Sequence, residues 1–219
     1  KNKKKKTKYN IIVMKKTVLL VAWCLIFSFT HATPITSYES KPNPKRILLV
    51  SFISQNFYST YENAEIAKTN EISEAEVLKI LDEKIAGVFE DSQEDGVEFV
   101  NFDTGTAPML EKVTFSYNNE KECLTPYLGD LSKDEFNTFM EENNVAYVIF
   151  LNTYEMKWID DPQYKLDNEI HYSIFEKDKK SIVEGKYTFS TPKLIPVVKM
   201  EIKYKKAVTN ICSAFLKNS

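Results

Sequence analysis

The chain has 219 residues, with 29 basic and 31 acidic side chains, 43% hydrophobic residues, many aromatic residues and only 5 glycines. This composition excludes a largely disordered protein, because it supplies enough apolar surface for a substantial core. Residues 1–32 hold eight lysines and no acidic residue, so the remaining chain has a net charge of −10, which excludes nucleic acid and anionic lipid as favoured partners.

Residues 14–32 have the three parts of a secretory signal peptide. Two lysines follow Met14, the apolar run 18–29 comes next, and the small residue Ala32 marks the expected cleavage site. The run is too short to span a bilayer, which needs about 20 helical residues. We therefore expect translation to start at Met14, with residues 1–13 as a leader, although a long basic start to the signal is the alternative. The mature chain is predicted to be periplasmic or secreted, without a transmembrane segment.

The mature chain is predicted to be one domain after a short tether. Residues 33–45 contain three prolines and favour an extended tether, and residues 46–219 have the length of a single domain. The first predicted strand, 46–52, is continuously apolar and therefore covered on both faces.

Later elements follow from capping signals and hydrophobic periodicity. Ser73 with Glu76 and Ser132 with Glu135 have the spacing of capping boxes, which start two amphipathic helices. The predicted helices are 74–91, 133–142 and a closing helix from about 198, and the predicted strands after the first are 97–102, 145–151 with an exposed continuation to 158, 170–176 and 182–189.

The resulting order, β-α-β-α-β-β-β-α, predicts an α/β fold. Long helical crossovers make the early strands parallel, whereas the charged turn 177–181 joins an antiparallel hairpin. A single mixed β-sheet with packed helices accommodates both kinds of pairing.

Asp103-Thr104-Gly105 matches the catalytic motif of aspartic proteases. Such an enzyme needs two carboxylates that share one proton, and this chain has one motif, so it would have to dimerise. The protease fold is also almost all β, whereas a well-capped helix precedes this motif. We therefore expect a turn after strand 97–102, and a hydrolase that uses Asp103 is the alternative.

Other catalytic and metal-binding patterns are sparse. His171 lies within a predicted strand, where a surface or hydrogen-bonded histidine is expected rather than a catalytic one. Asp160, Asp161, Asp167 and Glu169 cluster in one predicted loop without EF-hand spacing; a solvated acidic loop is expected, and Ca²⁺ is the alternative. No cofactor is expected.

Cys123 and Cys212 remain after signal removal. An exported protein lies in a compartment where disulfides persist, so a bridge between them is one interpretation. The other is that Cys212 is an ordinary buried thiol among apolar neighbours.

Aromatic residues in predicted loops are the candidate binding residues. Phe57, Tyr58 and Tyr61 lie in the predicted loop 53–71 after the first strand, and Trp158 and Tyr164 lie in the predicted loop 158–168. Tyr and Trp in such loops are typical interface anchors, although they could instead cover the edges of the sheet's own core. A third segment, the insert 109–130, carries further aromatic residues.

The element order resembles a group of bacterial envelope modules: the curli-secretion lipoprotein CsgG, the penicillin-binding-protein activator LpoB and the amino-terminal domain of TolB. The resemblance lies in the strand 46–52, the helix 74–91 with its following strand, the strand 144–151, the hairpin 170–189 and the terminal helix. It implies a non-enzymatic module that docks other envelope proteins. The sequence therefore predicts an exported interaction module that binds a protein or glycan partner through aromatic loops.

Overall fold

The computed structural model describes residues 43–52, 56–92, 96–102, 108–160 and 162–219. None of the helices among these residues is long and apolar enough to cross a membrane. The predicted signal segment, most of the tether, Asp103 and Asp161 lie outside the described residues.

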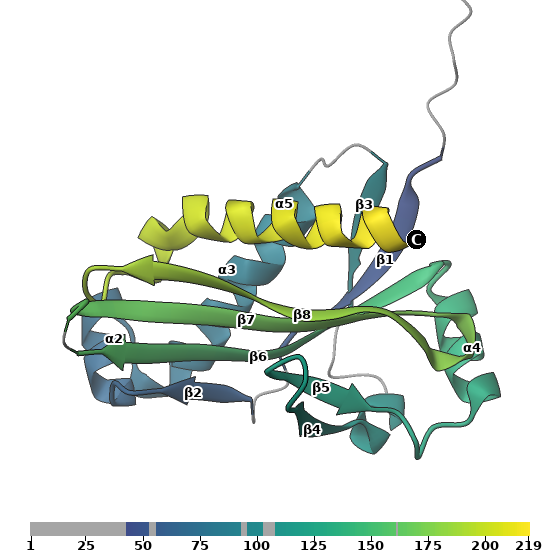
Figure 1. The fold of residues 1–219 in the computed structure, drawn as a ribbon, viewed down its shortest axis with the longest axis horizontal. Helices are drawn as coiled ribbons and strands as arrows, with labels where there is room; N and C mark the ends of the chain where they lie inside the picture. The colour runs from purple at the N-terminus through teal and green to yellow at the C-terminus, as the bar shows by residue number, and fades with distance from the viewer. Residues whose placement is uncertain (1–42, 53–55, 93–95, 103–107, 161) are drawn as a thin grey trace, which may run out of the picture. The chain divides into compact units, whose positions relative to one another are not determined.

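A six-stranded mixed sheet forms the centre of the fold (Figure 1). Its strands are β1 (Lys45–Val50), β2 (Phe57–Ser59), β3 (Val97–Asn101), β6 (Tyr147–Ile159), β7 (Lys165–Glu176) and β8 (Lys180–Thr191). The order is β3-β1-β6-β7-β8, with β2 beside β6. β1 is parallel to β3 and to β6, whereas β6, β7 and β8 are antiparallel. The predicted α/β class and mixed pairing are confirmed.

β1 is buried because layers cover both of its faces. Ile47 and Leu49 belong to one hydrophobic cluster, and Leu48 and Val50 belong to the other. Successive side chains of a strand point to opposite faces, so a strand between two layers must be apolar at every position. This requirement accounts for the unbroken apolar run in the sequence.

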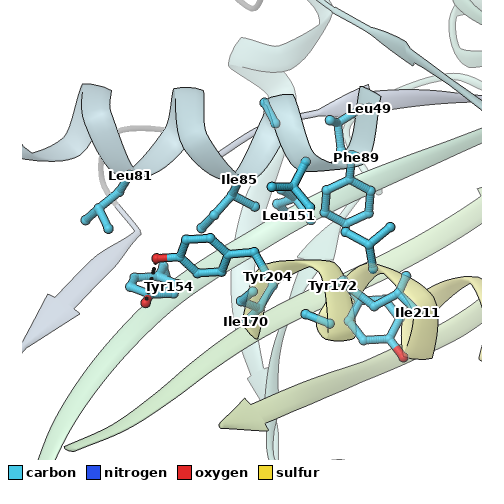
Figure 2. Close-up of a cluster of buried hydrophobic side chains, with 14 of the residues drawn as sticks. Leu49, Leu81, Ile85, Phe89, Leu151, Tyr154, Ile170, Tyr172, Tyr204 and Ile211 are labelled. Carbon is cyan, nitrogen blue, oxygen red and sulfur yellow. Dashed lines mark hydrogen bonds between the residues drawn. The ribbon is translucent and has the colours of Figure 1, made fainter. Parts of the chain in front are cut away.

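Three helices cover one face of the sheet. They are α2 (Asn63–Asn70), α3 (Val77–Asp91) after the short 3₁₀ turn Glu74–Glu76, and α5 (Glu201–Asn218) after the 3₁₀ turn Val197–Met200. Side chains of α3 and α5 meet those of β1, β6 and β7 in one cluster (Figure 2). Leu81, Ile85 and Phe89 are buried, which confirms the predicted inner face of α3.

The opposite face is apolar at one end only. There α4 (Lys133–Glu142) packs Phe136, Phe139 and Met140 against the sheet. The predicted capping box starts this helix: the Glu135 N–H donates to Ser132 Oγ at 3.1 Å, and the Ser132 N–H donates to Glu135 Oε2 at 2.8 Å.

A two-stranded antiparallel hairpin lies on the same face as α4. It consists of β4 (Thr114–Asn118) and β5 (Cys123–Tyr127), and the 3₁₀ turn Pro108–Lys112 precedes it. The hairpin contacts the polar part of this face.

Three predictions about the organisation were wrong. The predicted loop 53–71 contains β2 and α2, and the predicted insert 109–130 contains the β4–β5 hairpin. The predicted exposed continuation 152–158 belongs to β6, and its residues up to Met156 are buried. The reason is that β7 begins at Lys165 and pairs along the whole continuation, so the predicted loop 158–168 is a short turn.

No disulfide joins Cys123 and Cys212, although both are buried. Cys212 belongs to α5 and to the hydrophobic cluster beneath it, whereas Cys123 belongs to β5 on the other side of the sheet (Figure 1). The sheet separates the two thiols, so the bridge interpretation is wrong and the buried-thiol interpretation holds.

Candidate functional site

Four of the five predicted binding residues gather at one end of the sheet. We call this set, Tyr58, Tyr61, Trp158 and Tyr164, the aromatic end. Tyr58 is 53% exposed and Tyr164 is 63% exposed, and the other two are half-buried. The pairing of β2 with β6 brings the two distant sequence segments together.

Hydrogen bonds of Thr60, the residue after β2, hold the segment with Tyr58 and Tyr61 against β6. The Thr60 N–H donates to the Met156 carbonyl at 2.9 Å, and Thr60 Oγ1 accepts the Trp158 N–H at 2.9 Å. The rings of Tyr61 and Trp158 then meet edge to face with 6.5 Å between centroids. These two rings therefore have a defined position against the hydrophobic cluster of α3 and α5.

A tight turn between β6 and β7 positions the segment with Trp158 and Tyr164. The Asp160 carbonyl accepts the N–H groups of Gln163 at 3.1 Å and Tyr164 at 3.3 Å, and Asp160 Oδ1 accepts the indole N–H of Trp158 at 2.9 Å. Tyr164 has a φ of 41°, a left-handed conformation that is uncommon for an aromatic residue. Tyr164 is also the most exposed residue of the aromatic end.

Phe57, the fifth predicted binding residue, belongs to the core instead. Its ring stacks on that of Tyr154, with 6.2 Å between centroids and 7° between planes. Alternation along β2 then directs Tyr58 to the opposite face, beside its register partner Glu155. The core interpretation thus holds for Phe57.

The predicted acidic loop does not form a common site among the residues described. Asp160 accepts the indole of Trp158, whereas Asp167 lies in β7, accepts Ser190 Oγ–H at 2.5 Å and pairs with Lys165 at 3.0 Å. Asp161 lies outside the described residues. The structure therefore lends no support to the Ca²⁺ alternative.

A buried polar cluster on the face opposite α3 and α5 was not predicted. Glu155 of β6 and Glu169 and His171 of β7 place potential ligand atoms within 4.8 Å of one another. His171 is 1% exposed and Glu155 is 9% exposed. A β-bulge between Leu151 and Thr153 shifts the register by one residue, which turns Glu155 to the face of His171.

His171 is hydrogen-bonded at both ring nitrogens. Nδ1 accepts the N–H of Leu124 at 2.9 Å, so Nε2 carries the hydrogen of the neutral ring. Nε2 lies 3.3 Å from Glu169 Oε2 and 4.0 Å from Glu155 Oε1. Burial lowers the pKa of His171, and the neighbouring Glu169 opposes this shift. The ring is therefore neutral at pH 7.

The cluster does not fit a metal ion. A metal at Nε2 needs the lone pair there, which would place the hydrogen on Nδ1, against the N–H of Leu124. The carboxylates also have cationic partners: Lys157 pairs with Glu155, and Lys186 Nζ lies 3.5 Å from Glu169 Oε2. The two lysines therefore compensate the charge of the carboxylates without a metal ion.

We expect divalent metal ions to leave the melting temperature unchanged. An ion that binds only the folded state raises stability by mass action, and the occupied Nε2–H and lysine pairs leave the cluster without a free ligand set. Differential scanning fluorimetry with an excess of Zn²⁺ or Mn²⁺ tests this expectation. A rise in melting temperature that disappears in Glu155→Gln would show that the cluster binds metal.

A hollow of about 670 Å³ lies beside α4. Phe102, Pro108, Met109 and Phe139 supply apolar walls, and polar and charged side chains of α4, together with Lys112 and Asn143, line the remainder. Phe102 and Pro108 flank residues 103–107, which include Asp103 and lie outside the described residues. We place no site there.

Comparison with known proteins identifies no family. No family model and no curated protein matches the chain. Among solved structures, the chain is similar to the hypothetical protein CT253 from Chlamydia trachomatis, at 9% identity and a TM-score of 0.44, over 80% of this chain and 99% of that one. It is also similar to PelC, solved as a dodecamer from Paraburkholderia phytofirmans, at 7% identity and a TM-score of 0.36, over 78% and 92%.

Proposed function

We propose that the chain is an exported, non-enzymatic interaction module of a bacterial envelope that binds a protein or glycan partner through its aromatic end. The observation that carries this proposal is the exposure of Tyr58 and Tyr164 at the end of the sheet where Tyr61 and Trp158 form a fixed ring pair. Aromatic anchors held in position lose little side-chain entropy on binding, and Tyr and Trp dominate interface energetics. Both protein surfaces and sugar rings pack on such side chains.

The architecture supports binding rather than proteolysis. An aspartic protease brings two carboxylates together between β-rich lobes, whereas this chain forms an α/β sheet with helical layers. In the part of the chain that the structure describes, the buried Glu155 and His171 and the half-buried Glu169 interact with one another and with lysines. Among these described residues, the cluster presents no activated nucleophile.

Export and the envelope location rest on the sequence. The signal-like segment 14–32 supports export, and the resemblance of the strand and helix pattern to envelope docking modules supports a binding role. The net charge of −10 without residues 1–32 disfavours nucleic acid as the partner.

The proposal predicts that Tyr58→Ala together with Tyr164→Ala weakens partner capture. We expect the double variant to lose about tenfold or more in affinity, because each buried aromatic anchor contributes roughly 1 kcal/mol or more. The measurement is capture from an envelope extract on the immobilised chain, followed by biolayer interferometry with the captured partner. Protease treatment and periodate oxidation of the extract distinguish a protein from a glycan.

The matched control is Tyr127→Ala, which removes a tyrosine of similar exposure, 54%, from β5. Thermal melts confirm that all variants fold. Equal capture by the parent, the double variant and the control would contradict the proposed role of the aromatic end.

A further inference from the structure

The β4–β5 hairpin is fastened to the sheet at a single residue by both of its backbone groups. The N–H of Leu124 donates to His171 Nδ1 at 2.9 Å, and its carbonyl accepts Asn152 Nδ2–H at 2.8 Å. Cys123, the preceding residue, is buried, so this part of β5 lies directly on the sheet.

Ion pairs surround this attachment. Lys121 Nζ lies 2.8 Å from Glu184 Oε2, and Lys186 Nζ lies 3.7 Å from Glu122 Oε2. These pairs join the turn of the hairpin to β8, and their side chains are partly exposed. Exposed pairs contribute little to stability, so we attribute most of the attachment to the hydrogen bonds of Leu124 and the burial of Cys123.

The bond from Leu124 exists only while His171 is neutral. An imidazolium carries hydrogens on both ring nitrogens and has no acceptor. Protonated Nδ1 would therefore oppose the N–H of Leu124, and a rotation of the ring by 180° would place the Cδ2–H there, which also offers no acceptor. Protonation thus converts a hydrogen bond into a donor–donor contact.

We propose that His171 makes the β4–β5 hairpin an acid-released latch: the neutral ring fastens Leu124 to the sheet, and protonation of the ring detaches it. This inference is independent of the partner proposed for the aromatic end.

Charged groups from three strands and from the hairpin face the ring and set the pH of release. The carboxylates of Glu155 and Glu169 favour the protonated ring, whereas burial and Lys186 oppose it. Four further charged groups lie around these. Lys157 pairs with Glu155, Lys121 pairs with Glu184, and Glu122 pairs with Lys186.

The sign of the pH effect follows from the direction of the shift. Burial lowers the pKa of folded His171 below its ordinary value of 6.5, so the unfolded chain or released hairpin takes up the proton more readily. The attachment is therefore fully present above pH 6.5 and is lost as the pH falls below that value.

Asn152 gives the released state a compensation. Its side chain is fully buried, and Oδ1 has no hydrogen-bond partner among the described residues. When the hairpin lifts, water can reach this oxygen and also the Leu124 N–H. Hydration therefore offsets part of the cost of detaching the strand.

The test combines the tautomer of His171 with amide exchange in the full chain. Ring ¹⁵N shifts at pH 7.5 should show an unprotonated Nδ1. The exchange rate of the Leu124 amide is corrected for the pH dependence of intrinsic amide exchange. The corrected rate should increase roughly five- to tenfold from pH 7.5 to about pH 5, because one hydrogen bond is lost. Amides of β1 should not respond. The chain's other histidine, His31, is distinguished by resonance assignment.

Two variants complete the test. His171→Gln should give exchange at Leu124 that is the same at both pH values, because glutamine does not titrate. Glu169→Gln removes a carboxylate that raises the pKa of His171, so release should shift to lower pH. A protonated Nδ1 in the neutral parent, or a hairpin whose exchange ignores pH, would overturn the latch. So would a His171→Gln variant that keeps the parent's pH response.

Discussion

Replacing Tyr154 with alanine is expected to lower the free energy of unfolding by about 3–5 kcal/mol. The side chain is 1% exposed, and its ring contacts Phe52, Phe57 and Tyr204. Its hydroxyl donates to Asn168 Oδ1 at 2.8 Å and lies 3.2 Å from the hydroxyl of Tyr204 (Figure 2). Truncation therefore leaves a cavity and removes the partner of a buried amide oxygen.

Tyr154 also joins β2 to the core, because Phe57 of β2 stacks on its ring. We therefore expect the alanine variant to lose amide-exchange protection in β2 before the rest of the sheet. Urea unfolding measures the loss of stability, and Tyr154→Phe is the matched control. It keeps the ring and should lose only about 1–3 kcal/mol. Equal losses in the two variants would show that the hydroxyl network, rather than the packed ring, determines the effect.

Phe136→Ala is expected to have a comparable effect on the opposite face, again about 3–5 kcal/mol. Phe136 is fully buried, and its ring meets that of Phe175 edge to face with 6.4 Å between centroids. It is the central apolar contact of α4, so its loss should weaken docking of the whole helix.

Lys133→Ala is the control for this second prediction. Lys133 lies in the first turn of the same helix and is exposed, so its replacement should change stability by less than about 0.5 kcal/mol. Chemical unfolding of both variants at one pH measures the difference. A small loss in Phe136→Ala would contradict a structural role for the α4 layer.

Local patterns were sufficient to predict the main elements. The apolar run of β1 and the periodicity of α3 arise because these elements are buried against a layer of the fold. Any strand or helix in such a position needs the same pattern, whichever residues it contacts. The capping box at Ser132 is also local, because its partners are three residues apart. These features required no knowledge of which distant residues meet.

The missed elements depend on partners far away in the sequence. β2 is only three residues long, and its structure comes from pairing with β6, about 100 positions later. The β4–β5 hairpin likewise gains its place from Asn152 and His171. Short segments of this kind carry too weak a local preference to be recognised alone.

The candidate site was predictable in residue type but not in geometry. Aromatic residues near Tyr58 and Trp158 were evident from the sequence, but the register of β2 decided that Phe57 enters the core and Tyr58 faces outward. Glu169 and His171 share a strand face by alternation, which the sequence could have indicated. The bulge before Thr153 was needed to bring Glu155 to them.

The sequence by itself therefore determined the fold class, the sequence of major helices and strands, and the residue types available for binding, because hydrophobic periodicity and capping act over a few residues. Tertiary structure alone decided which aromatic rings are exposed, that Cys123 and Cys212 lie on opposite sides of the sheet, and that Leu124 fastens a hairpin to His171. The physical reason is that one residue of strand register reverses the face of every following side chain. That register is set by long-range pairing and a single bulge.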